Sequence, residues 1–202
     1  MIDFEGIDGS GKTTQAELIF KHLTRLGIPV RLLREPTHGP YGRIIRDILS
    51  GRLPRRSPRE ELDLFVKDRQ ENVRNHIEPA LSNGDVVLID RYYYSTMAYQ
   101  GALGIDVEEI REINESFAPK PDLVLIFLVP VEKGILRIMA DRENGVDHYE
   151  KDAFLRKVDA IFRSFKDPWI RFMDGERSLP EVSQEVASLI DHFLTEEGWG
   201  VF

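Results

Sequence analysis

The strongest constraint on the fold lies in Phe4–Thr14, where the sequence reads FEGIDGSGKTT. Gly6 is followed by four residues and then by Gly11, Lys12 and Thr13, which is the spacing of a P-loop. Glycines allow the left-handed turns that aim successive backbone N–H groups at an anion, and the helix that follows adds the positive end of its dipole. The segment therefore predicts an α/β fold that begins with a phosphate-binding loop between a strand and a helix.

Within this loop, each residue type has an expected task. We expect Lys12 to reach the β- and γ-phosphates of ATP and the Thr13 hydroxyl to hold Mg²⁺. The alternative is an incidental glycine-rich turn, which is disfavoured because the apolar residues Ile2 and Phe4 can form the preceding strand. The predicted nucleotide site comprises Gly6, Ile7, Asp8, Gly9, Ser10, Gly11, Lys12, Thr13 and Thr14.

The apolar pattern of the remaining chain predicts a parallel sheet. Short apolar runs without strict alternation are typical of parallel strands covered on both faces, and they occur at residues 1–5, 29–34, 86–90, 122–128 and 168–173. Helical spacing predicts helices over 13–26 and 58–82, and capping residues predict helix starts at Ser57, Asp106 and Ser178. Pro79 is expected to kink or weaken the last turn of the helix over 58–82.

Composition limits the functions that this chain can have. The net charge of −8 argues against a nucleic-acid partner, because no global positive field attracts the phosphate backbone. The absence of cysteine excludes disulfides and thiolate chemistry. The longest apolar run, Leu123–Val129, is too short to span a bilayer, and Asp3 and Glu5 are not typical of a signal peptide. We therefore expect a cytoplasmic protein with no membrane partner.

Arginines near strand ends indicate an enzyme of phosphoryl transfer rather than a regulatory GTPase switch. A GTPase switch is disfavoured because no Asn-Lys-x-Asp segment follows a strand. Transfer from ATP to a phosphate-bearing acceptor collects several negative charges in one pocket, and arginines would neutralise them. The charged segment 137–152 is expected to be a mobile lid that excludes water, although a solvated helix hairpin remains the alternative. The arginines in suitable positions are Arg34, Arg46, Arg91, Arg137 and Arg142.

Four segments together resemble the thymidylate kinase family, over roughly residues 1–165. They read FEGIDGSGKTT, LLREPT, LFVKDRQENVRNHIEPAL and LIDRYYYSTMAYQG. The resemblance implies a three-layer P-loop kinase fold in one domain over residues 1–202, with a small mobile lid. It also implies a homodimer that transfers the γ-phosphoryl group of ATP to dTMP with Mg²⁺ in dTTP biosynthesis. Another nucleoside monophosphate or deoxynucleoside kinase of this fold, or a non-catalytic nucleotide-binding relative, stays open.

The resemblance assigns residues to the acceptor's base and sugar. It implies that Phe65 stacks on the thymine ring, although core packing is the alternative because Phe65 lies on the apolar stripe of its helix. Arg69 would donate to a thymine carbonyl, and Thr96 and Gln100 would line the same pocket. Tyr99 would pack against the deoxyribose and disfavour a 2′-hydroxyl group. A planar aromatic ring and a fork of donors suit a pyrimidine.

The resemblance assigns other residues to the phosphates and the metal. Arg46 and Arg91 would hold the acceptor's phosphate, for which bidentate arginine is well suited. Glu35 would act near that phosphate and the water ligands of the metal. Asp90 would lie beside Mg²⁺ at the tip of its strand, and Asp8 would face the acceptor sugar.

This sequence departs from the family pattern at three places. Gly9 stands where some members carry an arginine in the P-loop, so Arg137 and Arg142 would supply the catalytic charge from the lid. His148 replaces the usual lid arginine, and Thr37-His38 replaces a more usual glycine pair. The expected catalytic set is Asp8, Lys12, Arg91, Arg137 and Arg142.

Overall fold

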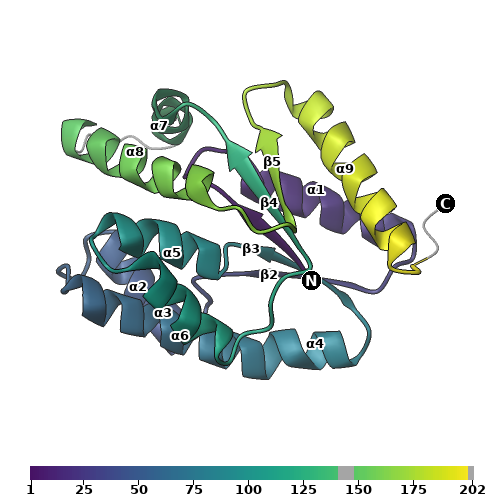
Figure 1. The fold of residues 1–202 in the computed structure, drawn as a ribbon, viewed down its shortest axis with the longest axis horizontal. Helices are drawn as coiled ribbons and strands as arrows, with labels where there is room; N and C mark the ends of the chain where they lie inside the picture. Colours follow the sequence, from purple (N-terminus) through teal and green to yellow (C-terminus); the bar gives the residue numbers. More distant parts are fainter. Residues whose placement is uncertain (141–147, 200–202) are drawn as a thin grey trace.

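The computed structural model describes residues 1–140 and 148–199, and it places a parallel sheet between two layers of helices (Figure 1). The predicted fold class is confirmed. The strands lie in the order β2-β3-β1-β4-β5, and the predicted bounds agree with the observed ones to within two residues. Every neighbouring pair in this sheet is parallel. The strands are β1 (Ile2–Glu5), β2 (Val30–Arg34), β3 (Val86–Asp90), β4 (Leu123–Leu128) and β5 (Ile170–Asp174).

The central strand β1 separates an apolar face of the sheet from one that carries charged groups. Ile2 and Phe4 pack into a cluster with α1 (Lys12–Arg25) and α9 (Leu179–Glu196), which cover one face of the sheet. Because successive side chains of a strand alternate between faces, Asp3 and Glu5 project toward the other layer. Both carboxylates are fully buried there.

The second layer contains the helices that will form the walls of the site. A second apolar cluster joins this face of the sheet to the helices of this layer and includes the buried tyrosines Tyr92, Tyr93 and Tyr94. A smaller cluster of Ile45, Ile48 and Leu64 joins α2 to α3. The bounds are α2 (Pro40–Leu49), α3 (Pro58–Asn72), α4 (Glu78–Ser82), α5 (Tyr93–Ala102), α6 (Val107–Glu115) and α8 (His148–Ser164). The helix starts predicted from Ser57, Asp106 and Ser178 are confirmed at α3, α6 and α9.

The predicted helix over residues 58–82 changes its winding earlier than expected. The π-helical turn η1 (Val73–Ile77) joins α3 to α4, so the disturbance lies ahead of Pro79 and not in the last turn. Proline lacks an N–H group, and its ring crowds the carbonyl group four residues earlier, here that of Asn75. A wider turn at Asn75 relieves this crowding and lets the helix continue to Ser82.

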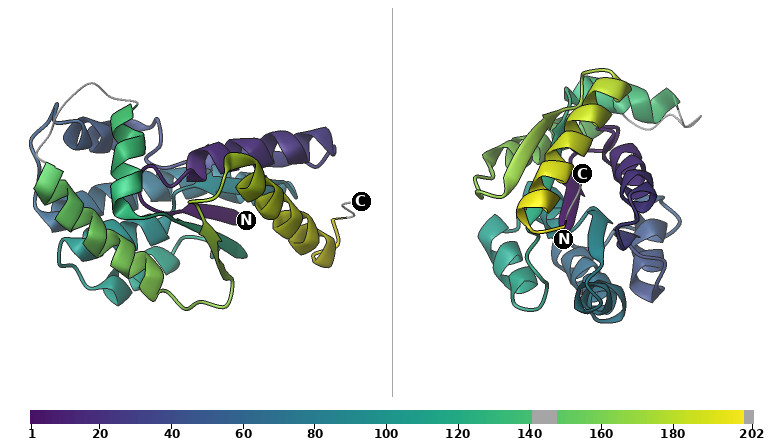
Figure 2. Two further views of the ribbon diagram at one scale, coloured as in Figure 1. Left: turned by 90° about the horizontal axis from the view of Figure 1, so that it is seen from above. Right: turned by 90° about the vertical axis from the view of Figure 1, so that its right-hand side faces the viewer.

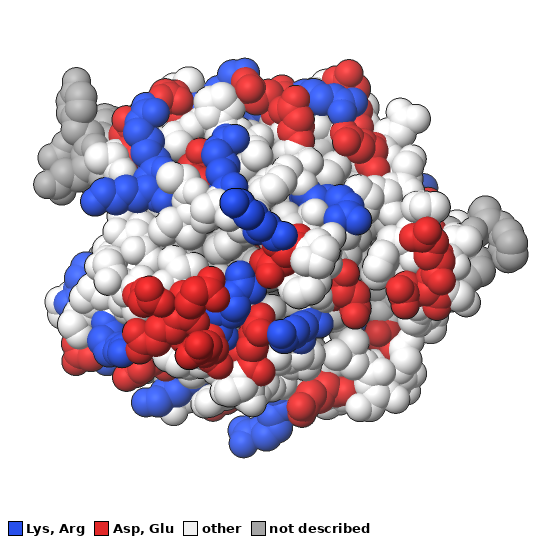
Figure 3. Space-filling view, in the orientation of Figure 1, with Lys and Arg blue, Asp and Glu red and all other residues white. Residues whose placement is uncertain are grey.

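Helix α7 (Val131–Ala140) and helix α8 lie at the end of the molecule away from the amino terminus (Figure 2). Most of the predicted lid, residues 137–152, lies outside the described residues or has no described side chains, so the lid stays a prediction. Figure 3 shows acidic and basic side chains interspersed on one face, with acidic ones gathering over α6, whose nine residues include four glutamates. No helix in the described part of the chain combines the length and apolar character needed to cross a membrane.

Candidate active site

The P-loop connects β1 to α1, and its glycines are required by its geometry. Gly6, Gly9 and Gly11 have φ values of 137°, 78° and 94°, in the region that side chains rarely adopt. A Cβ atom on Gly6 would lie 2.5 Å from the carbonyl oxygen of Phe127, and one on Gly9 would lie 2.3 Å from that of Gly134. In this conformation position 9 has no room for a side chain, so positive charge at this loop has to come from other residues.

Lys12 is the first residue of α1, and its ammonium group is held over the loop. Only 4% of the residue is exposed, and Nζ donates to the carbonyl oxygen of Ile7 at 3.2 Å. The carboxylate of Asp8 lies 3.8 Å from the same nitrogen. Burial lowers the pKa of Lys12 to about 8, the nearby Arg91 cation acts in the same direction, and Asp8 opposes them. A bound phosphate would restore the charged form, so the loop favours an anion at this nitrogen.

Thr13 and Asp90 form a contact that fits a magnesium site. Thr13 Oγ1 donates to Asp90 Oδ2 at 2.7 Å, and Arg34 Nε lies 3.4 Å from that oxygen. The other oxygen, Asp90 Oδ1, is buried and has no hydrogen-bond partner within the described part of the chain. Hydroxyl and carboxylate oxygens are the ligands that Mg²⁺ prefers, usually together with phosphate oxygens and water. These two residues therefore fit the metal that the P-loop implies.

Arg91 links the P-loop to α5, the helix that carries the residues predicted to contact the acceptor. Its φ of 72° is unusual for a residue other than glycine, and this strained backbone directs the guanidinium toward the loop. The guanidinium donates to Asp8 Oδ1 at 2.5 Å and to Ser95 Oγ at 2.8 Å. It also lies 5.3 Å from the ring centroid of Tyr99. Asp8, Arg91 and Tyr99, predicted from distant motifs, therefore lie together.

Glu5 is a site residue that the sequence reasoning did not identify. Its Oε1 accepts from the backbone N–H groups of Tyr92 and Ser95 at 2.8 and 2.9 Å, and its Oε2 accepts from Ser95 Oγ at 2.5 Å. Burial raises the pKa of Glu5, which Arg91 and these hydrogen bonds partly offset. Glu5 thus fixes the turn after β3 in which Arg91 lies. An acidic residue directly before a P-loop glycine was the available signal.

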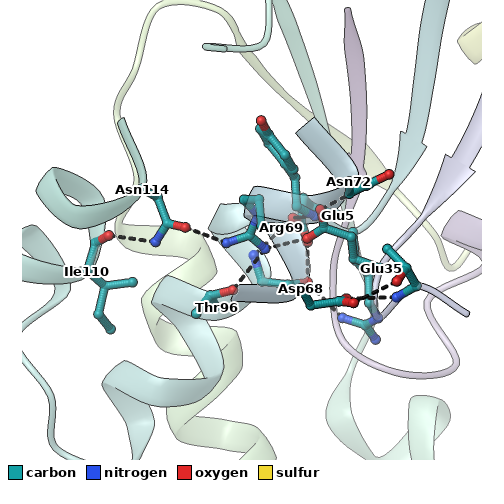
Figure 4. A network of polar contacts seen from close by, with 12 residues as sticks. Glu5, Glu35, Asp68, Arg69, Asn72, Thr96, Ile110 and Asn114 are labelled. Carbon is teal, nitrogen blue, oxygen red and sulfur yellow. Dashed lines mark hydrogen bonds and ion pairs between the residues drawn. The ribbon is translucent and has the colours of Figure 1, made fainter. Parts of the chain in front are cut away.

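A buried network surrounds Arg69, of which 1% is exposed (Figure 4). Nη2 donates to Glu35 Oε2 at 2.6 Å and to Thr96 Oγ1 at 3.1 Å, and Nη1 donates to Asn114 Oδ1 at 2.6 Å. Asn72 Nδ2 donates to the second oxygen of Glu35 at 3.0 Å. Burial raises the pKa of Glu35, and Arg69 opposes the shift. Both carboxylate oxygens of Glu35 thus have protein partners, and its role near the metal's water ligands stays a prediction.

The predicted base pocket combines buried polar atoms with an aromatic ring. Thr96 and Gln100 lie one turn apart on α5, and Gln100 is 3% exposed. Gln100 Oε1 and Arg69 Nε have no hydrogen-bond partner among the described residues. An unpaired acceptor and an unpaired donor suit a planar ligand that offers both kinds of group. Phe65 is half-buried against the cluster between α2 and α3, so its stacking role stays a prediction.

The loop after β2 contains the Thr37 that replaces a more usual glycine. Asp68 Oδ2 accepts from the Thr37 backbone N–H group at 2.8 Å, and Asp68 Oδ1 accepts from Thr37 Oγ1 at 2.6 Å. Arg46 Nη1 donates to the carbonyl oxygens of Thr37 and Pro36, the latter at 2.9 Å. The hydroxyl group of Thr37 thus ties the loop to α3. The phosphate-binding role of Arg46 stays a prediction, because these contacts hold part of its guanidinium on the loop backbone.

Of the two arginines predicted in the lid, the structure describes the side-chain contacts of Arg137 but not those of Arg142. Arg137 Nη1 donates to the carbonyl oxygen of Gly9 at 3.0 Å, and Nη2 donates to that of Gly175 at 3.0 Å. Arg137 therefore bridges the P-loop and the loop between β5 and α9, which is a positioning task, and its catalytic role stays a prediction. Arg142 and the side chain of His148 lie outside the described residues. Thr14 is exposed on α1.

Comparison with known proteins identifies the family. A family model described as thymidylate kinase matches residues 4–186. The chain belongs to the thymidylate kinase family. A thymidylate kinase of Desulfotalea psychrophila is 45% identical, covering 96% of this chain and 95% of that protein. A probable thymidylate kinase of Archaeoglobus fulgidus is 43% identical, covering 96% of each chain. A thymidylate kinase of Akkermansia muciniphila is 44% identical, covering 92% of this chain and 88% of that protein. The resemblance carried by the four segments is confirmed.

Proposed function

We propose that this member of the thymidylate kinase family transfers the γ-phosphoryl group of ATP to dTMP, giving dTDP and ADP. The observation that carries the proposal is the position of Arg91. Its guanidinium contacts Asp8 in the P-loop, and the helix α5, which begins two residues later, carries Thr96 and Gln100. The donor's phosphates and the acceptor's base would therefore lie on opposite sides of one arginine, as a transfer between them requires.

The reaction needs charge neutralisation and alignment more than a general base. A phosphate oxygen of dTMP attacks the γ-phosphorus of ATP, the bond from that phosphorus to the bridging oxygen breaks, and ADP leaves. The attacking oxygen is already largely anionic near neutral pH. Lys12 and Arg91 stabilise the charge on the transferring group and on the acceptor's phosphate. When bound beside Thr13 and Asp90, Mg²⁺ supplies further charge neutralisation at the β- and γ-phosphates.

Base selection would follow from the buried pocket on α5. Arg69 offers donors to a thymine carbonyl, and Gln100 and Thr96 offer groups that pair with the remaining base edge. Phe65 would stack on the ring and Tyr99 would pack against the deoxyribose. Cytosine carries an amino group where thymine carries a carbonyl, so a fixed arginine donor would discriminate between the two bases.

The remaining assignments complete the proposal. Arg46 and Glu35 would act at the acceptor's phosphate, and Asp8 would face its sugar. The lid, residues 137–152, would close over the phosphates, with Arg137 and Arg142 supplying charge. We also propose that residues 1–202 form a single domain, and that the protein is a cytoplasmic homodimer.

The test is a coupled ADP-release assay with dTMP, dUMP, UMP, CMP, AMP, GMP and thymidine as acceptors, with and without Mg²⁺. We expect Mg²⁺-dependent turnover with dTMP above all other acceptors. A preference for thymidine would indicate a deoxynucleoside kinase. ATP binding without turnover on any acceptor would indicate a non-catalytic relative and would contradict the proposal.

A further inference from the structure

Asn114 on α6 contacts the arginine that would read the base, although no motif predicts it. Its Oδ1 accepts from Arg69 Nη1 at 2.6 Å, and the side chains of both residues are buried (Figure 4). Asn114 itself is fully buried. The contact joins positions 45 residues apart in the chain, so it depends on the tertiary packing of α6 against α5, which brings Asn114 to the Arg69 side chain of α3.

The orientation of the Asn114 amide is fixed by a second hydrogen bond. Nδ2 donates to the carbonyl oxygen of Ile110, one turn earlier on α6, at 2.7 Å. A flipped amide would set its NH₂ group against the guanidinium and its oxygen against a carbonyl oxygen, which is unfavourable at both ends. The side chain of Asn114 therefore presents only its acceptor oxygen to Arg69.

Some contacts of Arg69 compensate its charge, and others fix the direction of its guanidinium. Glu35 neutralises the guanidinium, whereas Thr96 and Asn114 are uncharged and restrict its plane. Asn114 is the acceptor on Nη1, and Glu35 and Thr96 both lie on Nη2. If the acceptor on Nη1 were lost, the guanidinium would carry a buried unpaired donor or rotate about the Nη2 contacts to find another partner.

We propose that Asn114 is a positioning residue for base recognition: it fixes the plane of the Arg69 guanidinium so that an N–H group points at the pyrimidine carbonyl that distinguishes thymine from cytosine. This inference rests on the proposed function. The inference places α6 among the elements that determine substrate specificity. It predicts that a less rigidly held Arg69 lowers both the affinity for dTMP and the preference of the enzyme for dTMP over dCMP. Binding of ATP, which the P-loop holds, is unaffected.

The experiment compares the parent enzyme with Asn114→Leu, and uses Ile113→Ala as the matched control. Ile113 also lies on α6 and packs against the core, but its apolar side chain cannot accept a hydrogen bond from Arg69. For each protein, kcat and KM are measured for dTMP, dCMP and ATP, together with Tm. For Asn114→Leu we expect roughly a tenfold higher KM for dTMP and a similar loss of the dTMP/dCMP ratio of kcat/KM, since one hydrogen bond to a charged group is lost. The control should lower Tm without changing that ratio.

A double-mutant cycle with Arg69→Gln makes the inference falsifiable independently of stability. In the Arg69→Gln background, Asn114→Leu should leave the dTMP/dCMP ratio unchanged, because the arginine it positions is gone. Asn114→Ala serves in place of the leucine variant if that variant does not fold. An unchanged ratio in a folded Asn114 variant, or an equal loss in Ile113→Ala, would overturn the inference. A parent enzyme without dTMP-dependent ADP release would overturn the proposed function itself, and the inference with it.

Discussion

The central strand buries a carboxyl group, that of Asp3, which has no hydrogen-bond partner among the described residues, and this leads to a stability prediction. Asp3 is 0% exposed, and within the described part of the chain neither carboxylate oxygen has a hydrogen-bond partner. Burial raises the pKa of Asp3 well above its ordinary value of 3.8, the charge of Glu5 acts in the same direction, and Arg69 opposes both. We expect Asp3→Asn and Asp3→Val to stabilise the fold at neutral pH.

The sign and size of the expected changes in unfolding free energy follow from proton linkage. Between the ordinary pKa and the raised pKa, the folded chain keeps a proton that the unfolded chain releases. The parent therefore loses about 1.4 kcal/mol of unfolding free energy for each pH unit in this window, relative to a variant that cannot ionise. Asp3→Asn removes only this pH-dependent loss of unfolding free energy. Asp3→Val also removes the buried unpaired polar group, which contributes about 1–3 kcal/mol more, and valine suits a strand.

Urea unfolding of the three proteins between about pH 5 and pH 7 measures these differences. The advantage of Asp3→Asn over the parent should grow as pH rises and shrink as pH falls toward the ordinary pKa. Asp3→Val should exceed Asp3→Asn at every pH. If both variants are less stable than the parent throughout, Asp3 has a favourable partner, such as ordered water, and the reasoning is wrong.

Four further predictions concern activity. Above about pH 8 the KM for ATP should rise as Lys12 loses its proton. Lys12→Ala should lower turnover about 10²- to 10³-fold at unchanged Tm. Near-normal turnover of this variant at saturating ATP would refute the P-loop assignment. Phe65→Ala should raise the KM for dTMP far more than that for ATP if the ring stacks on the base, whereas a lowered Tm alone would indicate core packing. Arg137→Lys keeps the charge but cannot bridge the Gly9 and Gly175 carbonyl groups, so it should raise the KM for ATP; parental values would favour a role of charge alone.

Much of the fold could be predicted because its signals are local. Short apolar runs between turn residues locate the strands, and capping residues such as Ser57 locate helix starts. The strand β1, which reads IDFE, carries two acidic residues, and both are buried because the strand is covered on both faces, as predicted. The sequence does not indicate what these carboxylates contact, whereas the structure shows that Glu5 fixes the turn after β3 by hydrogen bonds. No local pattern distinguishes a carboxylate that faces water from one that organises a polar interior.

The part of the site that sequence reasoning missed depends on packing between distant segments. The P-loop and the residues Arg91, Thr96 and Gln100 belong to contiguous motifs, so their neighbourhood could be inferred. Asn114 lies on an acidic helix, where a single amide usually faces solvent, and only the packing of α6 places it against Arg69. The bridging contacts of Arg137 are hidden for the same reason, since backbone carbonyl groups carry no sequence signal.

The exposure of their carboxylate partners separates the tasks of the two central arginines. Arg69 pairs with Glu35, whose side chain is 4% exposed, whereas Arg91 pairs with Asp8, whose side chain is 60% exposed. A buried carboxylate has no water to replace its partner, so Glu35 holds Arg69 in place. Asp8 can exchange its ion pair for water at little cost. In the proposed function, an incoming phosphate would therefore replace Asp8 as the partner of Arg91 while Arg69 stays fixed. This difference suits Arg91 to the proposed contact with the acceptor's phosphate and Arg69 to the proposed contact with its base.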